Sequence, residues 1–331
     1  MYKLLGISLA LAALLTINAV ASLAAAGLWR LIEAPMRRCS ARTRAEVLFA
    51  MRIAPLVVAV ISVVALLIPS YFAYEPYSTN EFVSKKLGAL AIVSAVGVTI
   101  ALWRGLRSWL ATRSLLREWI DAATPMQLSE IDVPTFRIPH LFPIIAVVGI
   151  VRPRMFIAES VLRTLSEEEL TAAIAHECGH LAARDNLRRT LIRACRDILA
   201  IVPCGRSIDR AWSENAEAAA DEHAADRGST VALNLASALI AIARMVPAGA
   251  RPTLPAGAFI LGDETDGVMS RVKRLVALAG SSRRQPKLIF ISWAERIGLS
   301  LLLASLILTI ADSHSLASLH DAMEHVVRLL S

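Results

Sequence analysis

Two histidines that flank a glutamate are the residues of this sequence best suited to chemistry. They form the run His176-Glu177-Cys178-Gly179-His180. On a helix, residues four apart leave the same side, so both imidazoles can bind one metal ion. Glu177 falls at the flank of that side, where it can act as general base towards a water on the same ion, whereas Cys178 projects away and is not expected to bind. The run therefore predicts a site for one Zn²⁺ per chain that activates water.

This chemistry requires the run to lie inside a helix. Ser166 followed by Glu169 forms a capping-box pattern, which predicts a helix start just upstream. Leu170, Ile174 and Leu181 continue at helical spacing. The competing interpretation is an amphipathic helix that carries two histidines by chance.

A catalytic zinc takes three protein ligands, so the chain must supply one more. Glu217 and Asp221 are separated by three alanines, which places both carboxylates on one helical face and allows close approach to another helix. We expect Glu217 to be the third ligand and Asp221 to orient a zinc-binding histidine by a hydrogen bond. Glu214 and His223 are the competing ligands.

Several residues near these motifs are candidates for supporting roles. Asp185 and Asn186 follow the second histidine by one to two turns, and we expect them to cap the helix pair or to order the site through hydrogen bonds. A peptidase also needs a donor for the oxyanion that develops on the scissile carbonyl. His223 and Arg227, which follow the third-ligand region, are the candidates for that donor.

Prolines exclude long helices between residues 125 and 157, and two β-rich runs lie at 144–151 and 154–157. Gly149 between them predicts a small hairpin or a bulged edge. Val147, Val148 and Gly149 could hold a substrate backbone by strand addition. The alternative is an ordinary sheet that supports the catalytic helix.

The composition predicts a membrane protein, since 56% of the 331 residues are hydrophobic. The net charge is +7, and the basic residues cluster beside apolar segments, so we expect them to set topology and not to bind nucleic acid. The four cysteines show no paired spacing, which fits a reducing compartment. The predicted spans cover residues of about 4–28, 53–74, 87–103 and 288–311.

Arginine-rich segments follow the first and third spans, which predicts that both face the cytoplasm. The first span could instead be a cleaved signal peptide, but that would place the arginine-rich residues 29–52 outside the cell. Residues 104–120 mix arginines with tryptophan and leucine, so they form either an amphipathic helix on the inner membrane face or a solvated continuation of the third span. Both termini are then external.

The predicted fold class is a mainly α integral membrane protein with an α+β zincin-type domain inserted between the third and fourth transmembrane helices. Its parts are a membrane region (1–106), a cytoplasmic zinc domain (107–287), the fourth span (288–311) and an amphipathic external tail (312–331).

Four runs, at 148–154, 165–170, 176–180 and 217–221, resemble the membrane-embedded gluzincin peptidases. The resemblance is nearest to the beta-lactam-sensor antirepressor peptidases, with the CAAX-prenyl and heat-shock membrane protease group related. It implies His176, His180 and Glu217 as zinc ligands and Glu177 as base. The antirepressor peptidases carry a penicillin-binding domain after the fourth span, whereas here only residues 312–331 follow, with no Ser-x-x-Lys motif. Beta-lactam sensing by this chain itself is therefore not expected.

Together these features predict a zinc endopeptidase of the inner (plasma) membrane that faces the cytoplasm. Its expected partners are the lipid bilayer and a cytoplasmic or membrane protein substrate, such as a transcriptional repressor cleaved in signal transduction. The alternatives are a quality-control protease of membrane proteins, a metal-binding signalling scaffold without turnover, and a transporter or structural protein with a chance motif.

Overall fold

The computed structural model describes five long stretches of the chain and a few residues near its end. It is mostly helical, with one small sheet. The described residues are 2–75, 83–128, 132–195, 205–246 and 265–280, together with His314, Ala317, Ser318, His320, Asp321, Glu324 and His325.

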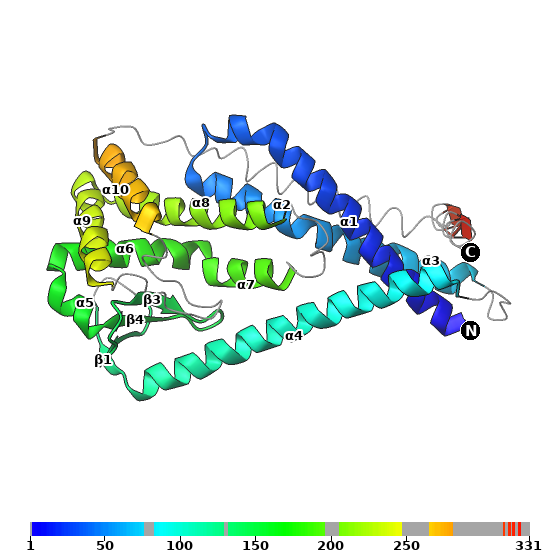
Figure 1. Ribbon diagram of the computed structural model, residues 1–331, viewed down its shortest axis with the longest axis horizontal. Helices are drawn as coiled ribbons and strands as arrows, with labels where there is room; N and C mark the ends of the chain where they lie inside the picture. The colour runs from blue at the N-terminus through cyan, green and yellow to red at the C-terminus, as the bar shows by residue number, and fades with distance from the viewer. Residues whose placement is uncertain are drawn as a thin grey trace.

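Within the described stretches, three helical segments are long and apolar enough to cross a membrane. They are α1 (Tyr2–Met36), the continuous run of α2 (Ala41–Ile61), η1 (Ser62–Leu67) and α3 (Ile68–Tyr74), and α4 (Lys85–Asp121). Figure 1 shows them as the long arm of the molecule. The predicted fourth span, 288–311, lies outside the described residues.

The outward faces of these helices are apolar. Leu23 on α1, Val64 on η1 and Ile92 on α4 are between 58% and 66% exposed. Large hydrophobic side chains exposed in such numbers on these helices fit a lipid environment better than water. The helices therefore indicate a membrane protein.

The third segment resolves an alternative that the sequence left open. α4 continues without a break from the predicted span to Asp121, so the arginine-rich part is an extension of the same helix. Near its end, Trp119 is buried beside Phe156 of the sheet, with ring centroids 5.2 Å apart. α4 thus joins the membrane region directly to the core of the other domain.

In the part of the chain that the structure describes, the sheet has four strands in the order β1-β2-β4-β3. β3 pairs antiparallel with β4 through a short hairpin, which confirms the hairpin that the sequence predicted. Gly149 follows β3 with φ of 110°, and a Cβ there would lie 2.9 Å from the Arg152 carbonyl oxygen, so the turn needs glycine. β3 is an outer strand of the described sheet. The strands are β1 (Thr124–Met126), β2 (Thr135–Ile138), β3 (Ile145–Val148) and β4 (Arg154–Ala158).

Among the residues that the structure describes up to Gly280, six helices follow the sheet. They gather with it at the end of the molecule opposite the N-terminus (Figure 1). α6 packs on the sheet and α9 packs on α6, with buried residues such as Ala173 and Leu235 in one core with Phe156 and Ile157 of β4. This core fixes α6, which carries the metal-binding motif. The helices are α5 (Glu159–Thr164), α6 (Glu167–Ala183), α7 (Asp185–Cys195), α8 (Gly205–Ala225), α9 (Ser229–Met245) and α10 (Thr265–Gly280).

Candidate active site

The start of α6 is set by the capping box that the sequence predicted. The Ser166 hydroxyl accepts a hydrogen bond from the Glu169 backbone N–H at 3.2 Å, and the Glu169 carboxylate accepts one from the Ser166 N–H at 3.0 Å. Both interactions satisfy backbone donors that a helix start leaves free. His176, Glu177 and His180 then lie within α6 and are at most 3% exposed.

α8 approaches α6 closely at Gly179. A Cβ at this position would lie 2.9 Å from the Ala220 Cα and 3.1 Å from the His223 Cβ. Only a residue without a side chain permits this approach at position 179, and Ala220 on the other helix contributes no more than a methyl group. The close contact brings Glu217 of α8 within reach of the two histidines.

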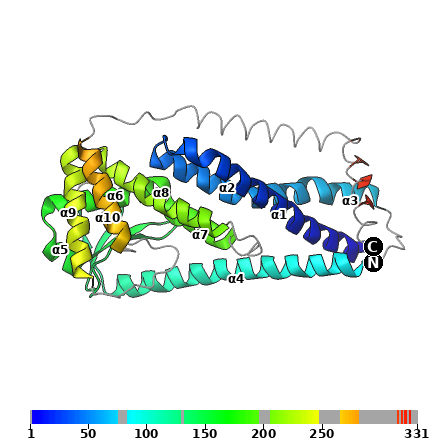
Figure 2. The same cartoon turned by 45° about the horizontal axis from the view of Figure 1, so that its top comes forward.

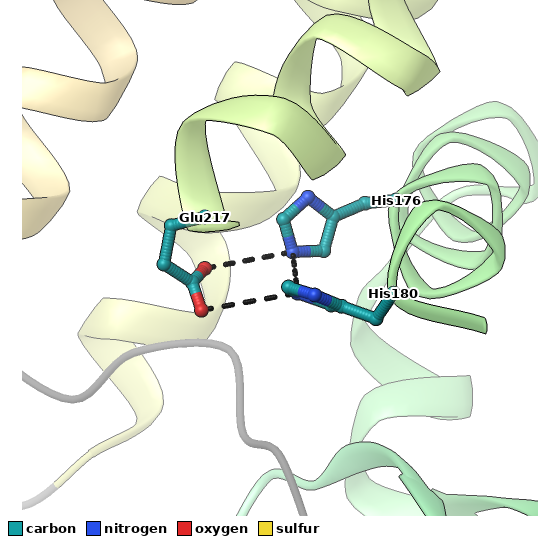
Figure 3. A group of neighbouring side chains, drawn as sticks. All are labelled: His176, His180 and Glu217. Atoms are coloured by element: carbon teal, nitrogen blue, oxygen red, sulfur yellow. Dashed lines mark hydrogen bonds and ion pairs between the residues drawn. The ribbon is translucent and has the colours of Figure 1, made fainter. Parts of the chain in front are cut away.

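Figure 3 shows the three side chains converging, His176 and His180 from α6 and Glu217 from α8. The Nε2 atoms of the histidines are 3.2 Å apart. One carboxylate oxygen of Glu217 lies 3.7 Å from Nε2 of His176, and the other lies 3.8 Å from Nε2 of His180. Ligands of one tetrahedral zinc are about 3.3 Å apart. The ligand atoms of this group all lie within 4.8 Å of one another, so the three residues could hold a metal ion.

The other ring nitrogen of each histidine faces a carboxylate. His176 Nδ1 lies 2.9 Å from Asp221 Oδ1, and His180 Nδ1 lies 2.8 Å from Asp185 Oδ2. A carboxylate acceptor keeps a proton on Nδ1 and leaves the Nε2 lone pair for a metal. Both rings are thus oriented for ligation, and two imidazoles with one carboxylate form a donor set that suits Zn²⁺.

Glu177 lies on α6 beside this group. Both of its carboxylate oxygens are buried and have no hydrogen-bond partner among the described residues. A buried carboxylate left without a partner is costly, so the arrangement fits a site that receives water and a cation. Burial raises the pKa of Glu177 to about 7, against the opposing charge of His180. A pKa near neutrality suits a general base.

Two arginines of α10 also lie beside the candidate ligands, and neither was predicted as a site residue. The Arg271 guanidinium lies 2.7 Å from Asp221 and 2.9 Å from Glu217, and Arg274 also pairs with Asp221. Arg271 is 8% exposed, so its charge is balanced by these two acids in a buried setting. The sequence shows only that this helix is basic, and that does not indicate which acidic residue it contacts.

Burial and the neighbouring charges shift the pKa values of Asp221 and of both histidines. Burial would raise the pKa of Asp221, but Arg271 and His176 hold it well below its usual range. Burial lowers the pKa of His176, which keeps that ring neutral and able to bind metal. For His180, burial acts in the same direction, but the hydrogen bond to Asp185 and the nearby acids outweigh it and raise the pKa.

Residues 146–251 match peptidase family M48. Members of this family are zinc metallopeptidases with an HExxH motif. The matched segment begins in β3 and includes all of α6 and α8, so it contains the three candidate ligands and Glu177. No curated protein matches the chain. The match supports a gluzincin metallopeptidase, hence a hydrolase.

Asn186, expected to order the site, lies on α7 and contacts the sheet and not a histidine. Its amide nitrogen donates to the carbonyl oxygens of Val147 at 2.9 Å and Gly149 at 3.3 Å. Val148 between them pairs with Arg154 of β4. Asn186 therefore holds the outer strand against α7, and it occupies carbonyl groups on the edge where strand addition was predicted.

The candidates for the oxyanion donor lie in different settings. His223 lies at the close contact of α8 with Gly179. Arg227 is exposed in the turn after α8. Within the described residues, it forms no ion pair with Glu217 or Asp221. The competing ligand Glu214 is outside the metal-binding group and pairs with Arg210 on the exposed side of α8.

Proposed function

We propose that this protein is an integral membrane zinc endopeptidase that cleaves a cytoplasmic or membrane protein substrate. The observation that carries the proposal is the convergence of His176, His180 and Glu217 beside the unpartnered carboxylate of Glu177. The match to peptidase family M48 over the same residues also supports it.

Different side chains of the protein have different roles in hydrolysis. Asp221 and Asp185 hold the two imidazoles in the orientation that ligation requires. When bound, Zn²⁺ supplies Lewis acidity that polarises the scissile carbonyl and lowers the pKa of water. Glu177 accepts the proton of the attacking water at its carboxylate and passes it to the leaving amine.

The cytoplasmic location is supported by the arginines at one end of the membrane helices. The link between α1 and α2 is rich in arginine, and positive segments stay in the cytoplasm. The first residue of α2, Ala41, hydrogen-bonds Glu222 on the helix that carries Glu217. The candidate site therefore lies on the same side as the positive segment. Regulatory cleavage of a transcriptional repressor is the role that the resemblance favours.

The test uses the full-length protein purified in detergent or nanodiscs. Glu177→Gln should keep one zinc per chain and lose cleavage of a casein or peptide-library substrate, whereas His176→Ala should lose the metal. Glu167→Gln makes the same change at an exposed position ten residues earlier on α6 and should leave both unchanged. Cleavage by Glu177→Gln at the parent rate would refute the mechanism.

The substrate can be identified in cells. Comparative proteomics of strains with the parent and with Glu177→Gln should reveal a protein that is cleaved only by the parent. A repressor among such proteins would support the regulatory role, whereas many unrelated membrane proteins would support quality control in its place.

A further inference from the structure

α8 lies between the helix that carries the histidines and a membrane helix. One of its faces presents Glu217 and Asp221 to α6, and another packs along α2 (Figures 1 and 2). α2 runs on without a break past Arg52 into the apolar residues of the predicted second span. The same helix therefore contacts the support of the third ligand and enters the membrane.

An apolar seam joins the two helices. From α2 it contains Ala45 and Leu48, and from α8 it contains Ile208, Trp212 and Ala216, each at most 5% exposed. Ala216 directly precedes Glu217. Buried side chains in contact transmit displacement, because protein interiors are close-packed and have low compressibility.

A polar interaction lies at each end of this apolar seam. At one end, the backbone N–H of Ala41 donates to the Glu222 carboxylate at 3.0 and 3.1 Å, which caps α2. At the other end, Arg52 Nε lies 2.7 Å from Asp209 Oδ1, with side chains only 10% and 16% exposed. These two polar interactions are about 17 Å apart along α2 and about 20 Å apart along α8. Together they fix the axial register of the two helices.

We infer that α2 is a positioning element for the metal site, which sets where α8 holds Glu217 and so couples the membrane helices to zinc binding. Packed helices shift by about 1–2 Å when switches operate, whereas metal–ligand distances tolerate about 0.2 Å. A small movement of α2 is thus enough to weaken the third bond. The inference rests on the proposed function, since it concerns regulation of the same site.

The test is a charge swap at the buried pair, in the full-length protein in nanodiscs. Arg52→Asp and Asp209→Arg each place like charges together, and each should lower zinc affinity, measured by competition with a chelator, by about tenfold or more. The double variant restores the pair in reverse and should return to within about threefold of the parent, since a charge pair depends on its partner. The matched control is Arg210→Asp, which disrupts the exposed Arg210–Glu214 pair on the same helix and should leave the affinity unchanged.

A milder variant keeps the test decisive if a charge reversal prevents folding. Asp209→Asn retains the size and an acceptor oxygen, and it should weaken zinc binding less but measurably. Equal affinities in the parent, Asp209→Asn and the folded single variants would overturn the inference, as would a loss that the double variant does not rescue. Zinc binding without cleavage by the parent would refute the proposed function alone, and no zinc binding by the parent would refute both.

Discussion

The burial of Glu177 leads to a prediction for the stability of the metal-free protein. Its pKa rises from the usual 4.5 to about 7 because burial disfavours the charged carboxylate. Between these values the folded state holds a proton that the unfolded chain releases. The free energy of unfolding therefore falls as pH increases through this window. The contribution of this one group amounts to about 3 kcal/mol.

Glu177→Gln removes the ionisable group while keeping its size. Relative to the parent, the variant should gain stability between pH 4.5 and pH 7, up to about 3 kcal/mol at pH 8. The measurement is denaturant-induced unfolding of the full-length protein in mixed micelles, with a chelator present to remove metal. The comparison is made between the shapes of the two pH profiles. The cost of burying the glutamine amide does not vary with pH, so it does not affect this comparison.

Glu167→Gln serves as the control, since this exposed carboxylate on the same helix should not alter the pH dependence. If the parent and Glu177→Gln gave parallel profiles from pH 5 to pH 8, the carboxylate would ionise as readily in the folded as in the unfolded chain. That result would refute the argument that burial tunes this group for proton transfer.

Three further substitutions test the surroundings of the site. Asp185→Ala removes the acceptor of the second histidine's Nδ1, and zinc affinity measured by chelator competition should fall about 10- to 100-fold; an unchanged affinity would show that this carboxylate does not orient the ring. Gly179→Ala places a methyl group 2.9 Å from the Ala220 Cα and should lower the free energy of unfolding by about 1–3 kcal/mol; a stability equal to the parent's would contradict the close packing. Arg271→Leu leaves Asp221 without one of its two arginine partners and should cost about 3–5 kcal/mol in the same assay, and a loss below 1 kcal/mol would count against a buried charge pair.

Local patterns in the sequence predicted much of the fold near the site. The capping box at Ser166 and the hairpin around Gly149 depend on residues a few positions apart, and both are present. The ligand roles of His176, His180 and Glu217 stay predictions, although the structure brings the three side chains together as the spacing implied.

Contacts between distant residues could not be predicted in this way. Arg271 is 50 residues from Asp221, and no spacing rule relates a basic helix to one particular acid. Asn186 was predicted to order the site, but its hydrogen bond to the Val147 carbonyl depends on how α7 packs against the sheet. The course of residues 104–120 stayed open because a helix on the membrane surface and an extended span share one amphipathic pattern.

The unbroken course of α4 constrains the length of the chain between bilayer and domain. Ile92 faces outward from its apolar part, while Trp119 is held in the domain core, so the rotational phase of one helix relates the two. Inserting a single residue between them would turn one end by about 100° relative to the other and lengthen the helix by about 1.5 Å. Either the packing of α4 on α1 or its packing in the domain core would then be disturbed. The number of residues in this connector is therefore fixed as firmly as the identity of the residues at its ends.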